Sequence, residues 1–171
     1  LLQRNNYYVV KDVEIIKNFK NILKNIEKLE ISLYILDSID KIYYMTEENG
    51  DFFDKLVEIL SFIDALPYVK KGYKYYVTLS FLRRIMIEHG IYDINEISIM
   101  IGKNKEENIQ KYRELLKIQR NSANMNETQE KMENYIGFLK KMIIIFENFI
   151  NRNLQTELEI RKFIMEEFYG N

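Results

Sequence analysis

Apolar side chains recur at steps of three and four residues through most of the chain, which is the spacing of amphipathic helices. In one regular example, Leu29, Leu33, Leu36 and Tyr43 share a face, and neighbouring isoleucines widen it. A stripe this broad indicates a helix that packs on more than one side. The predicted helical segments are residues 13–23, 25–46, 51–66, 73–89, 91–103, 105–119, 128–151 and 156–168, of which 91–103 is the least regular.

Cap and turn residues divide these segments. The expected N-caps are Asp12, Asp51 and Thr156, the last with Glu159 at capping-box spacing. The expected breaks are Asn49-Gly50, Leu66-Pro67, the C′ glycine Gly90 and a polar loop at residues 121–126. The composition of residues 6–10 (NYYVV) suits a strand, and a single strand needs partners. We therefore predict an all-α fold, a compact bundle of six or seven helices with one short N-terminal strand.

Composition excludes several kinds of site. The chain has no cysteine, which removes disulfides, thiolate zinc sites and cysteine nucleophiles. No apolar run approaches the roughly 20 residues of a membrane-spanning helix. The net charge is −1, but residues 67–120 carry 11 basic and 6 acidic side chains. A surface with that excess could meet an anion, although it falls short of the charge balance of a protein that coats DNA.

The residues that catalysis would need are poorly placed. The single histidine, His89, comes just before Gly90 at a helix end, where the helix dipole favours a cation, so a structural role is the simpler interpretation. Carboxylate pairs such as Glu47-Glu48 are adjacent in sequence and do not share a helix face. None of the six glycines forms a phosphate-binding loop. We therefore expect no enzyme activity and no cofactor.

Lysines alternate with tyrosines at residues 67–76 (PYVKKGYKYY). This pattern has two interpretations. The lysines could hold phosphates while the tyrosines stack on bases, or the rings could be buried at the start of a helix while the lysines remain in solvent. The candidate contacts for DNA or for an acidic peptide are Lys70, Lys71, Lys74, Arg83, Arg84, Arg161 and Lys162.

Four stretches resemble the helical C-terminal part of RecO proteins, in the order in which that family has them. They are residues 7–14 (YYVVKDVE) with 32–37 (SLYILD), 47–54 (EENGDFFD), 81–90 (FLRRIMIEHG) and 149–154 (FINRNL). RecO proteins have an N-terminal OB-fold followed by a helical domain. The resemblance implies that residues 1–11 are the end of the OB-fold, to which the strand would belong. Residues 12–171 would then be the helical domain.

The resemblance departs from the family at a small zinc site that RecO proteins often carry. Eight residues after Gly90, where the family often has Cys-x-x-Cys-Gly, this chain has residues 98–102 (SIMIG). Ser98 and Ile101 thus stand in place of two zinc ligands, and a zinc site needs about four ligands. We expect no metal there. The apolar replacement that we expect comprises Ile97, Met100 and Ile101.

The resemblance also implies a function, that of a non-enzymatic mediator of the RecF pathway in the bacterial cytoplasm, near the nucleoid. RecO proteins bind RecR, single- and double-stranded DNA, mostly through the OB-fold, and the acidic, Phe-ended tail of single-stranded DNA-binding protein. They support strand annealing and RecA loading. Docking such a tail requires an apolar notch between helices with Lys or Arg on its rim. The alternative is a helical protein-interaction module unrelated to DNA.

Overall fold

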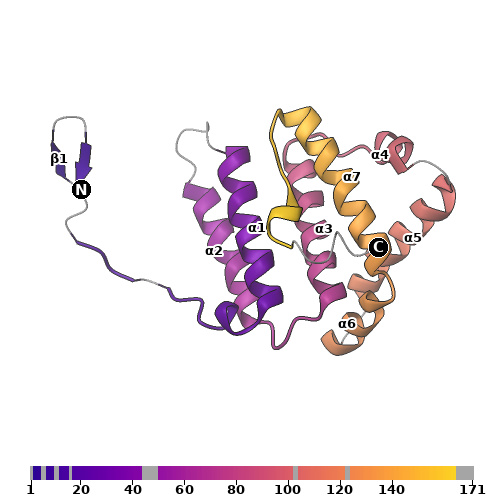
Figure 1. Cartoon of the computed structure of the whole chain (residues 1–171), viewed down its shortest axis with the longest axis horizontal. Helices are drawn as coiled ribbons and strands as arrows, with labels where there is room; N and C mark the ends of the chain where they lie inside the picture. Colours follow the sequence, from indigo (N-terminus) through magenta and orange to yellow (C-terminus); the bar gives the residue numbers. More distant parts are fainter. Residues whose placement is uncertain are drawn as a thin grey trace.

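The computed structural model describes residues 2–4, 7–9, 12–15, 17–43, 50–101, 104–121 and 124–164. Within these ranges the chain forms seven α-helices, as the apolar periodicity predicts, and the all-α class is confirmed (Figure 1). Their bounds are α1 Ile26–Tyr43, α2 Gly50–Ala65, α3 Lys71–Glu88, α4 Ile94–Ile101, α5 Lys105–Asn121, α6 Met125–Glu133 and α7 Ile136–Leu154. Two single-turn 3₁₀ helices lie at Ile22–Lys24 and Ile160–Lys162.

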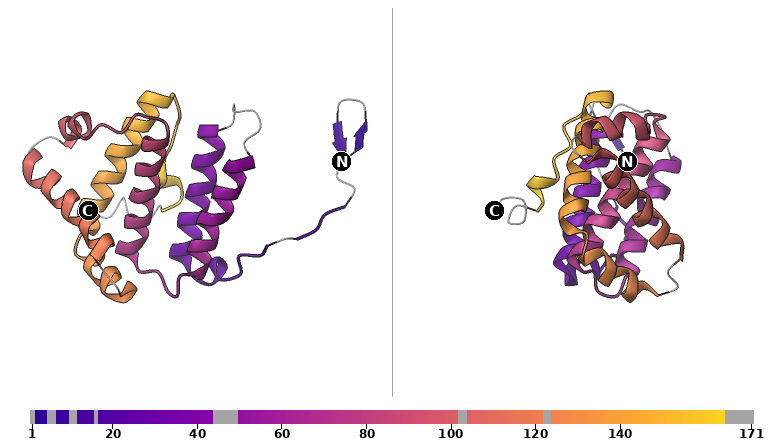
Figure 2. Two further views of the ribbon diagram at one scale, coloured as in Figure 1. Left: turned by 180° about the vertical axis from the view of Figure 1, so that it is seen from behind. Right: turned by 90° about the vertical axis from the view of Figure 1, so that its right-hand side faces the viewer.

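Helix α3 is the centre of the bundle. It packs most extensively on α7, and it also contacts α6 and α1, while α4 joins α7 and α2 joins α1. Figure 2 shows the consequence, with α1 and α2 on one side of α3 and α4 to α7 on the other. Of the 18 residues of α3, eleven are buried, so this helix has almost no solvent-facing side. The hydrophobic core therefore runs along α3 and α7.

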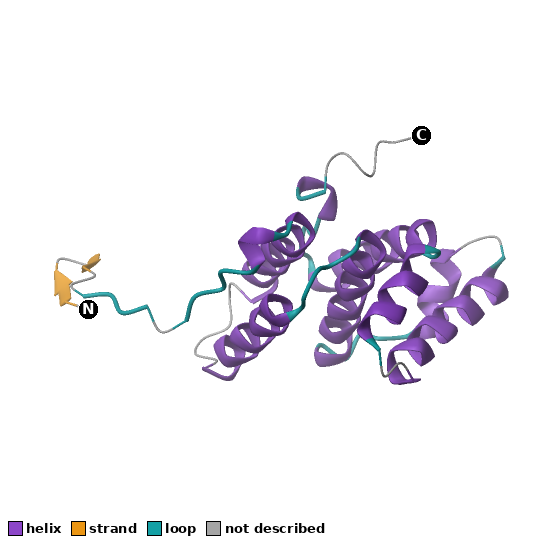
Figure 3. Ribbon diagram, turned by 90° about the horizontal axis from the view of Figure 1, so that it is seen from below, coloured by secondary structure: helices purple, strands orange, loops and turns teal. Residues whose placement is uncertain are grey.

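The N-terminal residues form a short antiparallel hairpin. Strand β2, Tyr7–Val9, falls inside the strand predicted at residues 6–10, and it pairs with β1, Leu2–Arg4. The pattern gave no signal for β1, because three residues are too few to show alternation. Figure 3 shows the hairpin joined to the helices by a long connecting segment. That the hairpin belongs to an OB-fold remains a prediction.

The helix predicted at residues 13–23 is wrong. Residues 12–15 and 17–19 are not helical, so Asp12 caps nothing, and only the 3₁₀ turn at 22–24 is wound. The apolar residues that suggested the helix, Val13 and Ile15, are 79% and 77% exposed. A helix this short depends on packing an apolar face, and residues 12–15 at the start of this segment are all exposed.

The helix predicted at residues 128–151 is two helices, α6 and α7, which are separated at Asn134 and Tyr135. A long-range contact fixes the break. Gly72 at the start of α3 lies so close to the α6 backbone that a Cβ there would be 2.5 Å from the carbonyl of Met132. The amide of Gly72 also donates to the Glu133 carboxylate at 2.6 Å. The end of α6 is thus held by α3.

The last predicted helix, at residues 156–168, is also absent from the described part, which ends at Ile164. Residues 155–164, which we call the strap, run extended along the bundle and close with the 3₁₀ turn at 160–162. Thr156 does not cap a helix, because its hydroxyl donates to the side chain of Asn151 on α7. Local capping-box spacing was outweighed here by contacts with α7.

The remaining boundaries follow the breaks read from the sequence. Helix α2 ends at Ala65, two residues before Pro67. Helix α3 ends at Glu88, and Gly90 has φ +67°, the left-handed conformation of a C′ glycine. Asp51 lies inside α2 and not before it, so its predicted capping role is wrong. The polar loop at 121–126 is shorter than expected, because α5 reaches Asn121 and α6 begins at Met125.

Candidate functional site

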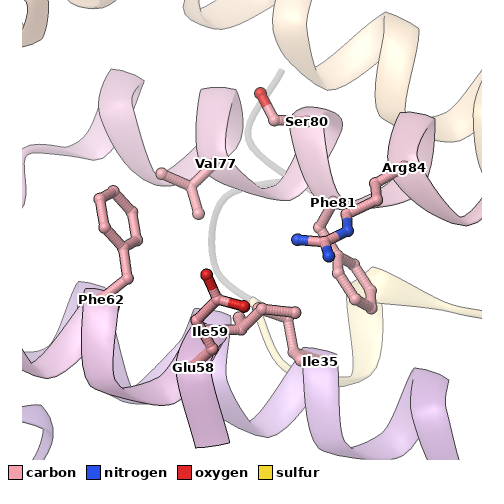
Figure 4. A pocket seen from close by; sticks show the side chains of 8 residues that line it. All are labelled: Ile35, Glu58, Ile59, Phe62, Val77, Ser80, Phe81 and Arg84. Atoms are coloured by element: carbon pink, nitrogen blue, oxygen red, sulfur yellow. The ribbon is translucent and has the colours of Figure 1, made fainter. Parts of the chain in front are cut away.

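An apolar pocket lies between α2 and α3, with α1 beneath it, and we call it the α2–α3 pocket. Its volume is about 250 Å³. It is lined by Ile35, Glu58, Ile59, Phe62, Val77, Ser80, Phe81 and Arg84. Figure 4 shows the side chains of α2 and α3 facing each other across the opening. Phe62 is 48% exposed, so part of this apolar surface is open to solvent.

The pocket exists because α2 is anchored mainly to α1. Leu60 and Ile63 are the buried residues of α2. The ammonium group of the buried Lys28 on α1 donates to the carbonyl oxygens of Asp64 and Leu66, which caps the end of α2. The carboxylate of Asp64 in turn accepts from the amide of Ile22 at 3.0 Å. These bonds fix α2 beside α1 and leave its other apolar side unpaired.

One end of the pocket carries a cluster of charges. Arg84 Nε donates to Glu88 Oε1 at 3.2 Å, and Lys55 Nζ lies 3.7 Å from the same oxygen. Tyr43 donates its hydroxyl to Glu88 Oε2 at 3.2 Å. In Figure 4 the guanidinium of Arg84 is turned toward the pocket, and the carboxylate of Glu58 faces it from the opposite wall. The rim therefore offers a cation on the α3 side and an anion on the α2 side.

The pKa shifts in this cluster follow from its geometry. Burial alone would raise the pKa of Glu88, but the hydrogen bond from Arg84 and the charge of Lys55 outweigh it and hold the pKa below its usual value. Burial, followed by the neighbouring Glu88 charge, raises the pKa of Tyr43 to about 12. At neutral pH, Lys55, Arg84 and Glu88 together leave one net positive charge at this end of the pocket.

Lys74, predicted to contact an anionic partner, lies in the core. Its side chain is 1% exposed and pairs with the carboxylates of Glu27 and Glu30 on α1, the latter at 2.6 Å. It also lies 5.2 Å from the ring centre of Tyr75. The prediction that Lys74 contacts a partner is therefore wrong: its charge holds α1 against α3 and is unavailable to a ligand.

The other predicted basic residues do not form one surface. Lys70, at the start of α3, pairs with Glu130 on α6, and Lys71 is next to it. Arg84 lies 14 residues further along, which is about 21 Å on a helix. Arg83 stacks on Tyr92, 5.2 Å from its ring centre. Arg161 and Lys162 belong to the strap. Of the predicted residues, only Arg84 lines the pocket.

Three of the four tyrosines in residues 67–76 are buried, as in the second interpretation of this stretch. Tyr73, Tyr75 and Tyr76 are 5% exposed or less, so they are core residues and cannot stack on bases. Tyr68 is 63% exposed. The pattern missed Glu58, Phe62 and Val77, which line the pocket. Phe62 lies off the main apolar face of α2, and that offset was the available signal for a second contact surface.

The segment at residues 97–101 is apolar on its inner side, as expected from the sequence. Ile97 and Ile101 on α4 are buried, Met100 is half-buried, and the hydroxyl of Ser98 donates to the carbonyl of Asn95. In the ranges that the structure covers, no group of three His, Cys, Asp or Glu side chains could hold a metal ion. Among the same residues, no helix combines the length and apolar character that crossing a membrane requires.

Comparison with known proteins gives no relative. No protein-family model, no curated protein and no solved structure matches the chain.

Proposed function

We propose that the chain is a non-enzymatic docking module of a RecO-type recombination mediator. In this proposal the α2–α3 pocket receives the Phe-ended acidic tail of a single-stranded DNA-binding protein, in the cytoplasm of a bacterium and near its nucleoid. The observation that carries the proposal is the pocket itself, an open apolar floor with the guanidinium of Arg84 at its rim. These are the two features that an acidic peptide with an aromatic anchor requires.

The energetics of such docking divide between the two features. An aromatic ring that leaves water for the pocket gains about 1.5–3 kcal/mol. Val77, Phe81 and Ile59 supply the apolar walls for that ring. A ligand carboxylate would accept a charge-assisted hydrogen bond from Arg84, which contributes about as much again. Lys55 would continue to compensate Glu88 while Arg84 engages the ligand.

The rim also sets a direction for the peptide. Glu58 on the α2 wall repels a carboxylate, whereas Arg84 and Lys55 attract one. The acidic residues of a bound tail would therefore lie toward the C-terminal end of α3, with the aromatic ring between Phe62 and Phe81. An acidic residue placed beside Glu58 would weaken binding.

The proposal assigns DNA and RecR binding, strand annealing and RecA loading mainly to other parts of such a mediator. The candidate basic residues are divided among the two ends of α3 and the strap, so they form no continuous track for a phosphate backbone. We expect weak binding to single-stranded DNA that disappears as salt is raised. Tight binding that persists at high salt would contradict this division of roles.

A second candidate is a helical protein-interaction module unrelated to DNA. The observation that favours it is the same dispersal of basic residues, together with the burial of Lys74. A titration of single-stranded oligonucleotide at low salt distinguishes the candidates. No binding at all would favour the second, and weak, salt-sensitive binding would favour the mediator.

The docking proposal is tested with a fluorescent acidic peptide that ends in Phe, added to the full chain and followed by anisotropy. Arg84→Ala should weaken binding about tenfold, since it removes one charge-assisted hydrogen bond. Replacing the terminal Phe of the peptide by Ala should weaken it at least as much. Arg113→Ala is the control, because Arg113 is exposed on α5, away from the pocket. Equal binding by the Arg84 and Arg113 variants would refute the assignment of the pocket.

A further inference from the structure

The strap is held to the bundle as a bound peptide is held to a groove. It runs between α1 and α7 (Figure 1), and three of its side chains, Leu158, Ile160 and Ile164, are 3% exposed or less. Glu157, which precedes them, and Glu159 and Arg161, which lie between them, are exposed. Alternation of this kind is how an extended peptide places its anchors in a groove.

Side chains of the helices satisfy the strap's backbone. Asn151 on α7 donates to the Leu158 carbonyl at 3.0 Å and accepts from the Leu158 amide at 2.7 Å. Glu147, one turn earlier, accepts from the Ile160 amide at 2.7 Å. Lys41 on α1 donates to the Glu157 carbonyl at 3.1 Å. Side chains of the groove thus bond the backbone of the strap at Glu157, Leu158 and Ile160.

Glu147 and Asn151 lie four residues apart on α7, so they project from one face. Glu147 Oε1 also accepts the hydroxyl of Tyr34 on α1 at 2.7 Å, which orients the carboxyl toward the strap. The ring of Phe163 then meets Tyr34 edge to face at 6.1 Å between centroids. Both helices therefore contribute polar groups and apolar surface to the same groove.

The strap joins α7 through a conformationally costly residue. Gln155 has φ 53° and ψ 41°, in the left-handed region. This conformation is unfavourable for a residue other than glycine. Release of the strap would relieve this strain at Gln155, whose side chain is exposed. The attached strap has the advantage of a high effective concentration, so a competitor needs either a high concentration or better contacts.

We propose that the groove between α1 and α7 is a peptide-binding site that the chain fills with its own strap, and that an extended partner peptide can replace the strap. The partner needs apolar residues at its first, third and seventh positions, matching Leu158, Ile160 and Ile164. It needs free amides at the first two of these, so proline is excluded there. Because Glu147 faces the third position, a basic residue at the second position favours binding over the strap's own Glu159. This site is separate from the α2–α3 pocket.

The experiment uses the full chain with a protease site inserted at Gln155. After cleavage, the strap remains only by its non-covalent contacts. A fluorescent peptide of residues 155–164 should then bind, and an unlabelled copy should compete with it. The same peptide with Ile160→Asp should bind at least tenfold more weakly, and one with Glu159→Lys should bind more tightly. The uncleaved chain should bind the labelled peptide at least tenfold more weakly than the cleaved chain.

A second variant tests release without cleavage. Ile160→Asp in the intact chain places a charge in the groove, and this chain should bind the labelled wild-type peptide at least tenfold more tightly than the unmodified chain. Ile99→Asp is the control, because Ile99 is 72% exposed on α4. Circular dichroism verifies that each chain is folded. Unfolding of the cleaved chain, or no peptide exchange in a folded one, would show that the strap is a fixed part of the core. Dimers of wild-type chains that swap straps would identify a second copy as the occupant and also overturn the proposal.

Discussion

Helices α2 and α3 are both apolar in sequence, yet the fold uses them in opposite ways. Helix α3 is covered by α1, α6 and α7, and eleven of its 18 residues are buried. Helix α2 packs mainly on α1, and it leaves Phe53 and Phe62 63% and 48% exposed. The comparison teaches that apolar content does not locate the core. The helix with fewer neighbours supplies the open wall of the α2–α3 pocket, where we propose that a partner docks.

The two helices also differ in how they use charge. On α3, Lys74 is withdrawn into the core, whereas on α2, Lys55 stays at the surface with its side chain 48% exposed. A count of basic residues along the sequence treats the two alike. Replacing Lys74 on α3 should therefore lower the free energy of unfolding more than replacing Lys55 on α2.

The largest effect is expected where α3 approaches α6. Gly72→Ala would place a Cβ within 2.5 Å of the backbone of Met132, and backbone atoms cannot rotate away as a side chain can. We expect a loss of about 3 kcal/mol in the free energy of unfolding. Gly137→Ala on α7 is the control. Nothing lies within 4 Å of its Cβ, so it should be neutral or stabilising by up to about 1 kcal/mol. Urea denaturation measures both, and similar values would contradict the close contact.

The next effect compares lysines on the two helices. Lys74→Met would remove the buried ammonium that pairs with Glu27 and Glu30, whose side chains are only 15% and 21% exposed. Because both partly buried carboxylates would lose this charge, we expect a loss of about 2 kcal/mol in the free energy of unfolding. Lys55→Met on α2 removes an exposed pair and should cost less than about 0.5 kcal/mol. Urea denaturation measures both variants. Equal losses in the free energy of unfolding would contradict the proposed difference between α2 and α3.

The smallest effect is pH-dependent and lies on α7, the main partner of α3. Burial raises the pKa of Glu147, even though Tyr34 and the Ile160 amide donate to it. A raised pKa in the folded state means that its contribution to stability is present below the ordinary value of 4.5 and is lost as pH rises through the folded value. The stability of Glu147→Gln relative to wild type should therefore increase with pH above 4.5 and then level off.

The Glu107→Gln variant should show the opposite dependence of stability on pH. The hydrogen bond from Lys111, and then its charge, lower the pKa of Glu107, so this carboxylate favours folding above 4.5. The stability of its variant relative to wild type should fall as pH rises. Equilibrium unfolding at several pH values measures how the stability of each variant, relative to wild type, changes with pH. No change with pH for Glu147→Gln would mean that the Glu147 carboxyl is solvated.

The ends of several helices could be predicted from the sequence, because local chemistry decides them. Pro67 cannot continue a helix, and Gly90 is suited to the left-handed position that follows one. The break between α6 and α7 could not be predicted. The apolar stripe continues across it, from Met132 to Leu139, and the deciding contact comes from Gly72, 60 residues away.

The candidate site was predictable only in part. Arg84 was named as a candidate, but Lys70, at the opposite end of α3, looks equivalent in sequence and pairs with Glu130 on α6. Which basic residue lines a pocket depends on where α2 is placed, and Lys28 and Asp64 fix that placement through contacts 36 to 43 residues apart. Burial of Lys74 likewise depends on α1, which no local pattern reveals.

The central claim is that a partner docks in the α2–α3 pocket, beside Arg84, and not beside Lys70 and Lys71 at the start of α3. The most direct measurement is an NMR titration of the full chain, labelled at Ile and Val methyl groups, with an acidic peptide that ends in Phe. We predict that the largest shifts fall on Ile35, Ile59 and Val77, and that they vanish in Arg84→Ala. Shifts that cluster instead beside Lys70 and Lys71, or no shifts at saturating peptide, would contradict the claim.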